Sequence, residues 1–522
     1  MVAAFLKPNL PNMMENGADR IAELNMAGLL RLDVFGEPHS QLADLPTLEN
    51  GLWKLSGDGR MELTYKIRSD ARWHDGTPVT SPDYVFGTTV AQDRQLDHVV
   101  DSLWSTHIES VMAPDPQTVV VTWTQAYYAA TSFPTGLRTG LFHLLPRHLV
   151  EPIYSQTPKE HFYAHPYFNV EFVHAGPFKV REWRPDSHVV LDAFDGYVLG
   201  RPKLDTIEVR FIPDPNTLLV NLLANEVHLS LGQSISPEQV RELGARWADG
   251  KGVTSPALAS SVGIFYQQIN PTPALLSDVR LRQALMHAFN RQGLADTFLA
   301  GTSPPAHAIV GGLHPRAHEI AVKYEYDLRR ANQLMEEMAW TKGPEGIWQD
   351  ASGRRMDTFE VRGIQEEEIR VQATIASEAD WKAFGIPTTL VMLPANHGRG
   401  DEYIHTWPAT RTAGIAAGPI AGLFSYFHSS RVRTPENRFR GGNGPRYIST
   451  ELDNSIDRAI ATVPRAEREL LIEQAVLHMT QNAITIGVYY NPYSNGVSNR
   501  LINVTTSSTY AHGWDAHLWD LK

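Results

Sequence analysis

The sequence predicts an α/β fold that is divided over more than one domain. The chain has 522 residues, which is more than a single hydrophobic core usually supports, so two or three domains are expected. Strand candidates and turns fill the first half, and strands alternate with helices from about residue 207 onward, as in layered α/β proteins. An apolar share of 42% and a charged share of 20% are ordinary for a soluble globular chain.

The first element is a strand, because Leu63, Tyr65 and Ile67 alternate with polar residues at the period of a half-buried strand. The pair Asp75-Gly76 then predicts a turn, since glycine adopts a positive φ angle without steric cost. These residues open the most informative stretch of the sequence.

A helix is predicted to begin directly after Thr80. The threonine stands at the N-cap position and Pro82 falls in the first turn. Asp83, three residues after the threonine, is placed to complete a capping box. We therefore expect a strand, a turn and a helix start in succession.

Later elements follow the same two periodicities. Strands are predicted over residues 119–123 and 207–212, and a helix over residues 218–223. Another helix is predicted from Asp278 onward, with Ser277 or Asp278 as its cap. One face of this helix forms an apolar stripe, made by Val279, Ala284, Leu285, Ala288 and Phe289. We interpret Arg280 and Arg282 as solvated or ion-paired residues on its polar face rather than as ligand contacts.

Composition and charge exclude several classes of function. A net charge of -12 argues against a nucleic-acid partner, which normally requires a basic face. No segment approaches the roughly 20 apolar residues of a membrane span. The chain has no cysteine, which removes disulfides, thiolate catalysis and cysteine-ligated metal. It also lacks the HExxH, P-loop and GxSxG motifs of common enzyme classes.

The residues around the predicted turn also resemble a sequence motif of a known protein family. Ile67-Arg68 is followed by WHDGTPVTSPD over residues 73–83. This sequence is similar to the signature segment of family 5 extracellular solute-binding proteins, the peptide- and nickel-type receptors of ABC importers. That pattern is a strand ending in Leu-Arg, then Trp-(Ser/His)-Asp-Gly-x-Pro-(Val/Leu)-Thr-x-x-Asp.

Six further segments resemble motifs of the same family, in the family's order along the chain. They are NMAGLLRLDVFGEPHSQL at 25–42, VHAGPFKVREW at 173–183, YVLGRPKLDTI at 197–207, DVRLRQALMHAFNR at 278–291, and the segments 326–340 and 447–459. Two positions differ from the motifs of the family. His174 replaces the first glycine of the second motif, and the expected proline of the first motif is displaced to Pro38.

By this resemblance the chain should adopt the two-lobed periplasmic-binding-protein fold (type II, cluster C), with an extra subdomain on the first lobe. The expected boundaries are 1–40, 170–265 and 488–522 for lobe I, 41–169 for the extra subdomain, and 270–485 for lobe II. Two crossings near 266–271 and 486–491 would form the hinge. Ligand would bind in the cleft between the lobes.

The resemblance implies an extracytoplasmic solute-binding receptor of an ABC importer, which captures a small ligand by cleft closure and makes or breaks no bond. The expected partners are the ligand, a peptide by family frequency, and an ABC permease in the membrane. No nucleic acid, cofactor or metal is expected, and the receptor should be a monomer. A sensor or chaperone-like receptor that works without a transporter stays open.

The first residues, Met1 to Phe5, lack the basic and then apolar order of a signal peptide. Two interpretations remain: a cytoplasmic protein, or a mature exported sequence that was given an initiator methionine. The resemblance favours the second, so we expect a periplasmic or cell-surface protein.

Aromatic residues are the leading candidates for ligand contact, because they offer large rigid surfaces with few torsions to fix. The resemblance points to Tyr489 and Tyr490 in a cleft strand, to Trp407, and to Tyr127 in the extra subdomain. Each of these residues could equally belong to the core. Met26, in the first motif, completes the apolar part of the candidate set.

The segment from Tyr403 to Pro435 departs from the family pattern. Peptide-binding members place an aspartate there, which holds the amino terminus of the ligand by a charge-assisted hydrogen bond. This segment contains no Asp or Glu, and Ala27 replaces a glutamate that often precedes Gly28. Arg411 could instead pair with a carboxylate or phosphate, or lie at the surface. An oligosaccharide or an anionic solute therefore stays open as the ligand.

Two other kinds of chemistry are weaker alternatives. A hydrolase acting on a polymer would need paired acids such as Asp380 and Asp401, but nothing in their spacing supports that pair. His161 and His165 have the i, i+4 spacing of metal ligands on a helix, although their aromatic neighbours favour packing against the core. We assign no catalytic residue and no metal site.

Overall fold

A computed structural model of the chain describes residues 1–7, 9–13, 18–33, 37–93, 95–96, 107–132, 144–232, 234–247, 251–253, 257–266, 274–299, 303–309, 316–365, 368–394, 409–415, 419–437, 439, 441–491, 494–505 and 513–522. The chain divides into two compact units. Unit 1 comprises Met1–Ser255 and Tyr493–Lys522, and unit 2 comprises Pro256–Pro492. The lobe boundaries and hinge positions expected from the sequence stay predictions.

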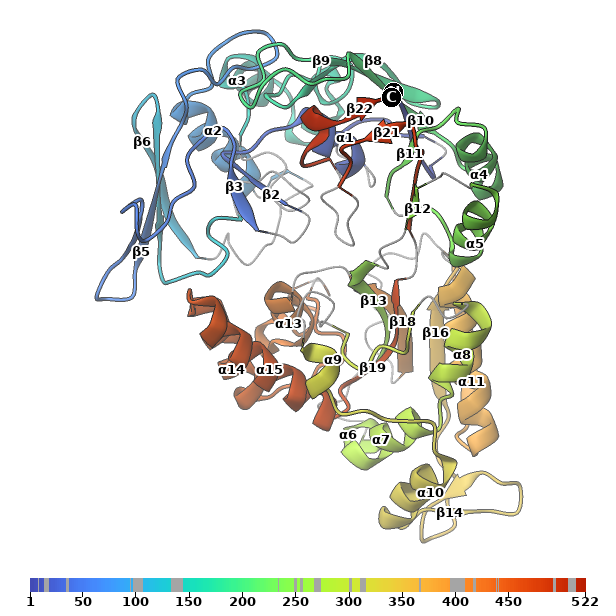
Figure 1. Cartoon of the computed structure of the whole chain (residues 1–522). Helices are drawn as coiled ribbons and strands as arrows, with labels where there is room; N and C mark the ends of the chain where they lie inside the picture. The colour runs from blue at the N-terminus through green and yellow to red at the C-terminus, as the bar shows by residue number, and fades with distance from the viewer. Residues whose placement is uncertain are drawn as a thin grey trace. The chain divides into compact units, whose positions relative to one another are not determined.

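Unit 1 is built on a seven-stranded sheet, drawn in Figure 1. Its strands, in order across the sheet, are β12 (Lys251–Val253), β20 (Asn495–Val497), β11 (Leu229–Ser230), β1 (Val2–Phe5), β10 (Thr206–Phe211), β9 (His188–Ala193) and β8 (Phe178–Arg184). β1 lies in the middle and runs parallel to both neighbours, β10 and β11. The other pairs in this sheet are antiparallel. β10 confirms the strand predicted over residues 207–212.

Alternate residues of β1 face opposite sides of this sheet. Ala3 and Phe5 pack into one hydrophobic core together with α1 (Asp19–Asn25). Ala4 packs into a second core with α4 (Pro215–Leu223) and α5 (Pro237–Arg246). Helices therefore contribute to the cores on both faces of the sheet, which is the layered arrangement of the predicted α/β class.

A second sheet of unit 1 contains the residues of the first predicted strand. Its order is β4 (Trp53–Leu55), β5 (Met61–Lys66), β7 (Thr118–Trp123) and β6 (Ile108–Asp115). Leu63 and Tyr65 on β5 are fully buried, as their alternation predicts. β7 confirms the strand predicted over residues 119–123.

The turn and the helix start that follow β5 are also confirmed. Gly76 has a φ angle of 88°, which favours glycine. Helix α2 (Ser81–Gln92) begins directly after Thr80, whose backbone N–H and side-chain hydroxyl both donate to Asp83 Oδ2 at 2.8 Å. The other oxygen of Asp83 accepts the backbone N–H of Arg147 at 2.9 Å, at the start of α3 (Arg147–Gln156).

Two small hairpins belong to unit 1 as well. One pairs β2 (Leu30–Leu32) with β3 (Pro38–Ser40), and the other pairs β21 (Leu501–Ile502) with β22 (Asp520–Leu521). Single turns of 3-10 helix occur at Lys159–Ala164, Pro166–Phe168 and Ala516–Leu518.

The helical pairing that the spacing of His161 and His165 would allow does not occur, and the favoured alternative, packing against the core, is wrong for His161. His161 is exposed in a 3-10 helix, and His165 caps the next one by accepting the backbone N–H of Tyr167 at its Nδ1. The two rings therefore do not share one α-helical face. Within the described ranges, no group of three or more side chains of metal-ligand type gathers.

Unit 2 is built on a five-stranded mixed sheet (Figure 1). Its order is β17 (Thr388–Leu393), β16 (Phe359–Ile364), β18 (Ala409–Ile415), β13 (Ala257–Tyr266) and β19 (Thr485–Asn491). β16 runs parallel to β17 and β18, whereas β13 runs antiparallel to β18 and β19.

Several helices are described in unit 2. They are α6 (Ala274–Ser277), α7 (Val279–His287), α8 (Arg291–Phe298), α9 (Ala317–Ile320), α10 (Leu328–Glu337), α11 (Glu368–Phe384), α13 (Pro419–Phe427), α14 (Thr450–Ala461) and α15 (Arg465–Gln481), with a 3-10 turn at Ser429–Arg431 and a hairpin of β14 (Thr341–Lys342) and β15 (Trp348–Gln349). Of these helices, α8 and α11 contact strands of the five-stranded sheet. Among the helices in the described part of the chain, none has the length and apolarity to cross a lipid bilayer.

The helix predicted from Asp278 is α7, and Asp278 caps it by accepting the backbone N–H of Arg280. The predicted ion pair of Arg280 forms with Asp278 at 2.8 Å. The polar-face prediction for Arg282 is wrong, because this side chain is only 2% exposed. Its guanidinium donates to four backbone carbonyls, those of Leu276, Ser277, Asn482 and Ala483.

Candidate ligand-binding site

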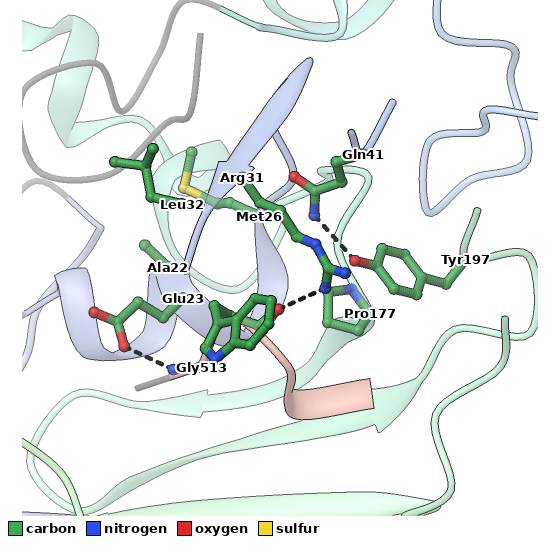
Figure 2. A pocket seen from close by; sticks show the side chains of 10 residues that line it. Ala22, Glu23, Met26, Arg31, Leu32, Gln41, Pro177, Tyr197 and Gly513 are labelled. Atoms are coloured by element: carbon green, nitrogen blue, oxygen red, sulfur yellow. Dashed lines mark hydrogen bonds between the residues drawn. The ribbon is translucent and has the colours of Figure 1, made fainter. Parts of the chain in front are cut away.

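A pocket in unit 1 is the candidate site, because most of its lining residues lie within or next to the sequence motifs. Its cavity volume is about 40 Å³, within about 440 Å³ of empty space that includes open solvent. The lining residues are Ala22, Glu23, Met26, Arg31, Leu32, Gln41, Pro177, Tyr197, Gly513 and Trp514. Figure 2 shows Glu23 and Tyr197 on opposite sides of the pocket, with Arg31 between them. Of the six residues predicted to contact ligand, Met26 lies in this pocket.

The pocket forms where α1 ends against the Gly-Pro-Phe motif. The backbone at Gly176 passes so close to α1 that an added Cβ atom would lie 2.3 Å from the carbonyl carbon of Asn25. Only glycine fits there, because such a contact is far inside van der Waals distance. The backbone N–H of Gly176 donates to the carbonyl of Asn25 at 3.2 Å. This close approach brings Pro177 and Met26 into the same wall.

Glu23 places a carboxylate in the wall of the pocket. The residue is 8% exposed, and its Oε2 atom accepts the backbone N–H of Gly513 at 3.0 Å. An added Cβ at Gly513 would lie 2.8 Å from both the Cβ and the carbonyl oxygen of Glu23. Glycine at 513 therefore lets this segment reach α1 and offer its N–H to the acid.

Arg31 and Trp514 form the next part of the wall. Arg31 Nη1 donates to the backbone carbonyl of Trp514 at 3.0 Å, and the guanidinium carbon lies 4.9 Å from the centroid of the Trp514 ring. A cation at this distance from an indole face is attracted by the ring quadrupole. The ring of His39 lies near the same indole, with centroids 5.7 Å apart. The arginine is thus held by a hydrogen bond and by the aromatic ring.

Gln41 and Tyr197 close the far side. Gln41 Oε1 accepts the backbone N–H of Gly28 at 2.9 Å, and Gln41 Nε2 donates to the Tyr197 hydroxyl at 3.0 Å. These two bonds fix which way the amide points. Burial raises the pKa of Tyr197, while the bond from Gln41 and the charge of Arg31 act in the opposite direction. The phenol is therefore neutral at physiological pH.

Two titratable groups lie behind the pocket. Burial, together with the positive charge of Arg31, lowers the pKa of His517 to about 4, and its ring packs edge-on to Tyr197 at 5.5 Å. Burial also raises the pKa of Asp515, which accepts hydrogen bonds from Trp519 Nε1 at 2.8 Å and from the Thr505 hydroxyl at 2.6 Å. His517 is uncharged at pH 7, and among the residues that line the pocket Glu23 is the acidic one and Arg31 the basic one.

Two histidines, the buried His174 and the half-buried His74, support the Gly-Pro-Phe wall. The backbone N–H of His74 donates to the carbonyl of His174 at 2.7 Å, and the N–H of His174 donates to His74 Nδ1 at 3.2 Å. His174 Nδ1 accepts the N–H of Ala27 at 3.1 Å, and His74 Nε2 lies 3.1 Å from the carbonyl of Gly176. Burial lowers the pKa of His74 to about 4 and that of His174 to about 3. Both rings are therefore neutral at pH 7.

The remaining predicted residues lie elsewhere. Tyr127 is 6% exposed and stacks on Trp123 with ring centroids 5.1 Å apart. Trp407 lies outside the described residues. Arg411 lies on β18 directly opposite Arg362 of β16 and is half-buried. The role of these residues in ligand contact stays a prediction.

Tyr489 and Tyr490 are both buried in unit 2, on β19. The Tyr490 hydroxyl donates to the carbonyl of Ala308 at 3.2 Å, and burial raises its pKa to about 12. The ring is thus engaged within its own unit. Ligand contact by either tyrosine is not tested and stays a prediction.

Sequence reasoning did not single out most of the pocket. Arg31, Gln41, Pro177 and Tyr197 all fall inside three of the motifs quoted above, so the motifs themselves were the available signal. Glu23 lies one helical turn before Ala27, the position where a glutamate was expected. Nothing in the sequence pattern pointed to Gly513 and Trp514.

Pockets for small solutes combine apolar and aromatic walls with a few polar groups, and the walls of this pocket have that composition. The profile of a family described as bacterial extracellular solute-binding proteins, family 5 Middle, matches residues 46–431. The chain belongs to these family 5 bacterial extracellular solute-binding proteins.

Individual relatives are similar to this chain over different lengths. A putative ABC transporter peptide-binding protein of Brucella ovis is 28% identical over 285 residues, 54% of this chain and 50% of that protein. The chain thus spans about half the length of the Brucella relatives that it matches. The oligopeptide-binding protein AppA of Bacillus subtilis is 24% identical over 439 residues, 83% of this chain and 76% of that protein.

A solved structure extends the likeness to the whole fold. The structure of AppA from Bacillus subtilis in complex with a nonapeptide has a TM-score of 0.75 at 20% identity, and the match covers 100% of this chain and 99% of that one. At this identity the likeness concerns the fold. It confirms the predicted two-lobed α/β fold, and the family match confirms the predicted family.

Proposed function

We propose that this chain is the solute-binding receptor of an ABC importer and that its ligand is a peptide. The observation that carries the proposal is the match of residues 46–431 to a family of extracellular solute-binding proteins. The names of the Brucella ovis and Bacillus subtilis relatives support a peptide as the ligand class. The pocket of unit 1 supports it too, since it combines an acid, an arginine and aromatic surfaces.

On this proposal the receptor works outside the cytoplasmic membrane, in the periplasm or at the cell surface. It hands its ligand to a membrane permease, acts as a monomer and makes or breaks no covalent bond. Binding acts by a population shift: a ligand that binds a closed conformation more tightly than an open one moves the protein toward the closed state. The size of that shift is limited by the difference between the two affinities.

Calorimetric titration of the purified protein with peptides of two to nine residues, oligosaccharides and small dicarboxylates tests the ligand class. We expect micromolar or tighter binding of at least one peptide class and none of the sugars. Trp514→Ala should weaken binding, because it removes an aromatic wall and the ring that holds Arg31. Trp340→Ala, the same change in unit 2, is the matched control and should leave affinity unchanged. Binding of oligosaccharides alone would overturn the peptide proposal.

A further inference from the structure

The chain carries all of its sulfur in methionine. It has 12 methionines and no cysteine, so thioethers are the side chains that a two-electron oxidant such as hydrogen peroxide attacks first. The reaction converts a thioether to a sulfoxide, and it is faster where the sulfur is more accessible. The exposure of each methionine therefore decides where an oxidant modifies the protein.

One methionine is far more exposed than the others. Met112 on β6 is 52% exposed, whereas Met26 in the pocket wall is 8% exposed and Met61 on β5 is 1% exposed. The remaining described methionines are either buried (Met13, Met286, Met335, Met356 and Met479) or half-buried (Met1, Met338 and Met392). Met14 lies outside the described residues. Within the described ranges, Met112 thus offers its sulfur to solvent most fully.

The exposure of Met112 follows from its place on an edge strand. β6 is the terminal strand of its sheet and pairs with β7. Val111 lies opposite Val121, which is fully buried. Because successive side chains of a strand point to opposite faces, Met112 faces the outer side of the sheet. The pairing also shifts register between Met112 and Asp115, and an irregularity of this kind bends the strand.

The surroundings of Met112 suit a sulfoxide. Val120 lies opposite Met112, and the neighbouring pair on the same face is Ser110 with Thr122. A sulfoxide is more polar than a thioether, and here its oxygen would meet hydroxyl groups and water. The same change at the buried Met61 would place a polar oxygen in the core without a hydrogen-bond partner, which is costly.

We propose that Met112 is the site at which peroxides modify this protein, and that the fold tolerates its sulfoxide. A lone pair of the Met112 sulfur attacks one oxygen of hydrogen peroxide, and the S–O bond forms as the O–O bond breaks. The sulfur is oxidised by two electrons, and the proton of the attacked oxygen passes to the departing hydroxide, which leaves as water. Methionine sulfoxide reductases can reverse such a modification. Oxidant consumed at Met112 does not reach Met26 in the pocket wall.

The test treats the purified protein with hydrogen peroxide and follows each methionine over time by peptide mass spectrometry. Trypsin places the informative methionines in separate peptides, which span residues 95–138 for Met112, 21–31 for Met26 and 61–66 for Met61. Fragment spectra locate the added oxygen, because Trp123 shares the first peptide and can also be oxidised. We expect Met112 to react roughly fivefold faster than Met26 and roughly tenfold faster than Met61, since access to the sulfur limits the rate.

Met112→Leu removes the sulfur and keeps an apolar side chain of similar volume. The fast oxidation should disappear in this variant. With one equivalent of peroxide per protein, oxidation of Met26 should rise, because its main competitor is gone. Met338→Leu is the matched control: Met338 is half-buried in unit 2, and its replacement should leave the oxidation of Met112 unchanged.

Thermal melting of the wild type after selective oxidation tests the tolerance. We expect the melting temperature to shift by no more than about 2 °C, the size of a typical surface change. Selective oxidation of Met112 with such a small shift supports the proposal. Equal oxidation rates of Met112 and Met61, or a fast reaction that persists in Met112→Leu, would overturn the assigned site. A fall of the melting temperature by more than about 5 °C would overturn the tolerance.

Discussion

Gly176 determines how closely the Gly-Pro-Phe motif can approach helix α1. Its missing side chain allows backbone contact with Asn25, and that contact sets the position of Pro177 in the pocket wall. The requirement is steric rather than conformational, because no positive φ angle is involved. A small side chain would have to displace two backbone segments at once.

Gly176→Ala should therefore destabilise the protein by about 1–3 kcal/mol or more, the range of overpacking substitutions. Gly244→Ala is the matched control. Gly244 lies inside α5 with open space around its Cα, so alanine there should stabilise by roughly 0.5–1 kcal/mol. Urea unfolding of both variants measures the two free energies. Equal stability of Gly176→Ala and the wild type would contradict the steric account.

Single residues also show where sequence reasoning stops. Thr80 and Asp83 could be assigned from local spacing, because a capping box depends on residues three apart. Glu23 and Trp514 could not be assigned to the pocket in this way, because the contacts of α1 with the C-terminal segment join residues far apart in the sequence. The helical position of Arg282 predicts a polar face, whereas two of its four carbonyl partners, those of Asn482 and Ala483, lie about 200 residues away in the sequence.

At the scale of elements, the signature segment after β5 is tied to the Gly-Pro-Phe loop by His74 and His174, a pair that we call the histidine clamp. His74 and His174 exchange backbone and ring hydrogen bonds, and Trp73 packs edge-on to the His174 ring at 5.5 Å. Each Nδ1 atom accepts a backbone N–H, so each ring must keep that nitrogen unprotonated. The clamp joins the turn at 73–76 to the loop that carries Gly176.

This clamp predicts a specific acid sensitivity. An unfolded histidine has a pKa near 6.5, whereas burial holds the folded values for His74 and His174 at about 4 and about 3. Below pH 6.5 the unfolded chain therefore binds more protons than the folded one. The contribution of these two histidines to the free energy of unfolding is complete above about pH 6.5 and is lost as the pH falls toward 4 and below.

His174→Asn should flatten this dependence, because the asparagine oxygen can accept the N–H of Ala27 without titrating. We expect the slope of unfolding free energy against pH, between 6.5 and 4, to fall by at most about 1.4 kcal/mol per pH unit. His161→Asn is the control, since His161 is exposed and should leave the slope unchanged. Guanidinium unfolding at several pH values measures it. An unaltered slope in His174→Asn would argue against a neutral buried ring.

Elements were predicted well where local chemistry sets them and less well where packing does. The helix at Asp278 has the predicted cap but ends at His287, and a new helix starts at Arg291. The apolar stripe continues through Ala288 and Phe289, so periodicity alone predicted one longer helix. Asn290 interrupts it, because its side chain accepts the N–H of Gly293 and caps the second helix.

At the scale of the molecule, each unit has its own sheets and its own internal hydrogen bonds. In unit 2, Arg291 is 3% exposed and donates to the carbonyls of Gly487, Ala306 and Tyr324. It thereby joins helix α8 to strand β19 and to the two segments after α8 that carry Ala306 and Tyr324. Burial lowers the pKa of Arg291 to about 10, so the guanidinium stays charged at physiological pH.

Arg291→Lys should loosen unit 2 and leave unit 1 largely unaffected. A lysine lacks the planar fork that reaches several carbonyls at once, and we expect a loss of about 2–4 kcal/mol. Hydrogen–deuterium exchange should rise in peptides from β13 and β19 and stay unchanged in peptides from β1 and β10. Arg316→Lys, whose exposed side chain pairs with Glu473, is the control and should change neither. An equal rise of hydrogen–deuterium exchange in both units would contradict the view that Arg291 stabilises unit 2 alone.

The division of the chain into two units could be predicted only in part from the sequence. Length predicted more than one domain, and the ordered motifs indicated the family and its two-lobed fold. The strand β20 could not be anticipated, because three residues, Asn495 to Val497, carry no periodic pattern of their own. Their pairing with β11 and β12 is fixed by the sheet they enter.

The place of β20 in the large sheet has a consequence for biosynthesis. A ribosome makes β11 and β12 long before it makes β20, yet β20 lies between them. Until β20 has been made, β11 and β12 lack the strand that pairs with both of them. Every strand of the five-stranded sheet in unit 2 has been translated by then. Residues 513 and 514 come later still and bring the last wall of the pocket. The wall of this pocket is therefore complete only once residues 513 and 514 have been made, after every strand of unit 2.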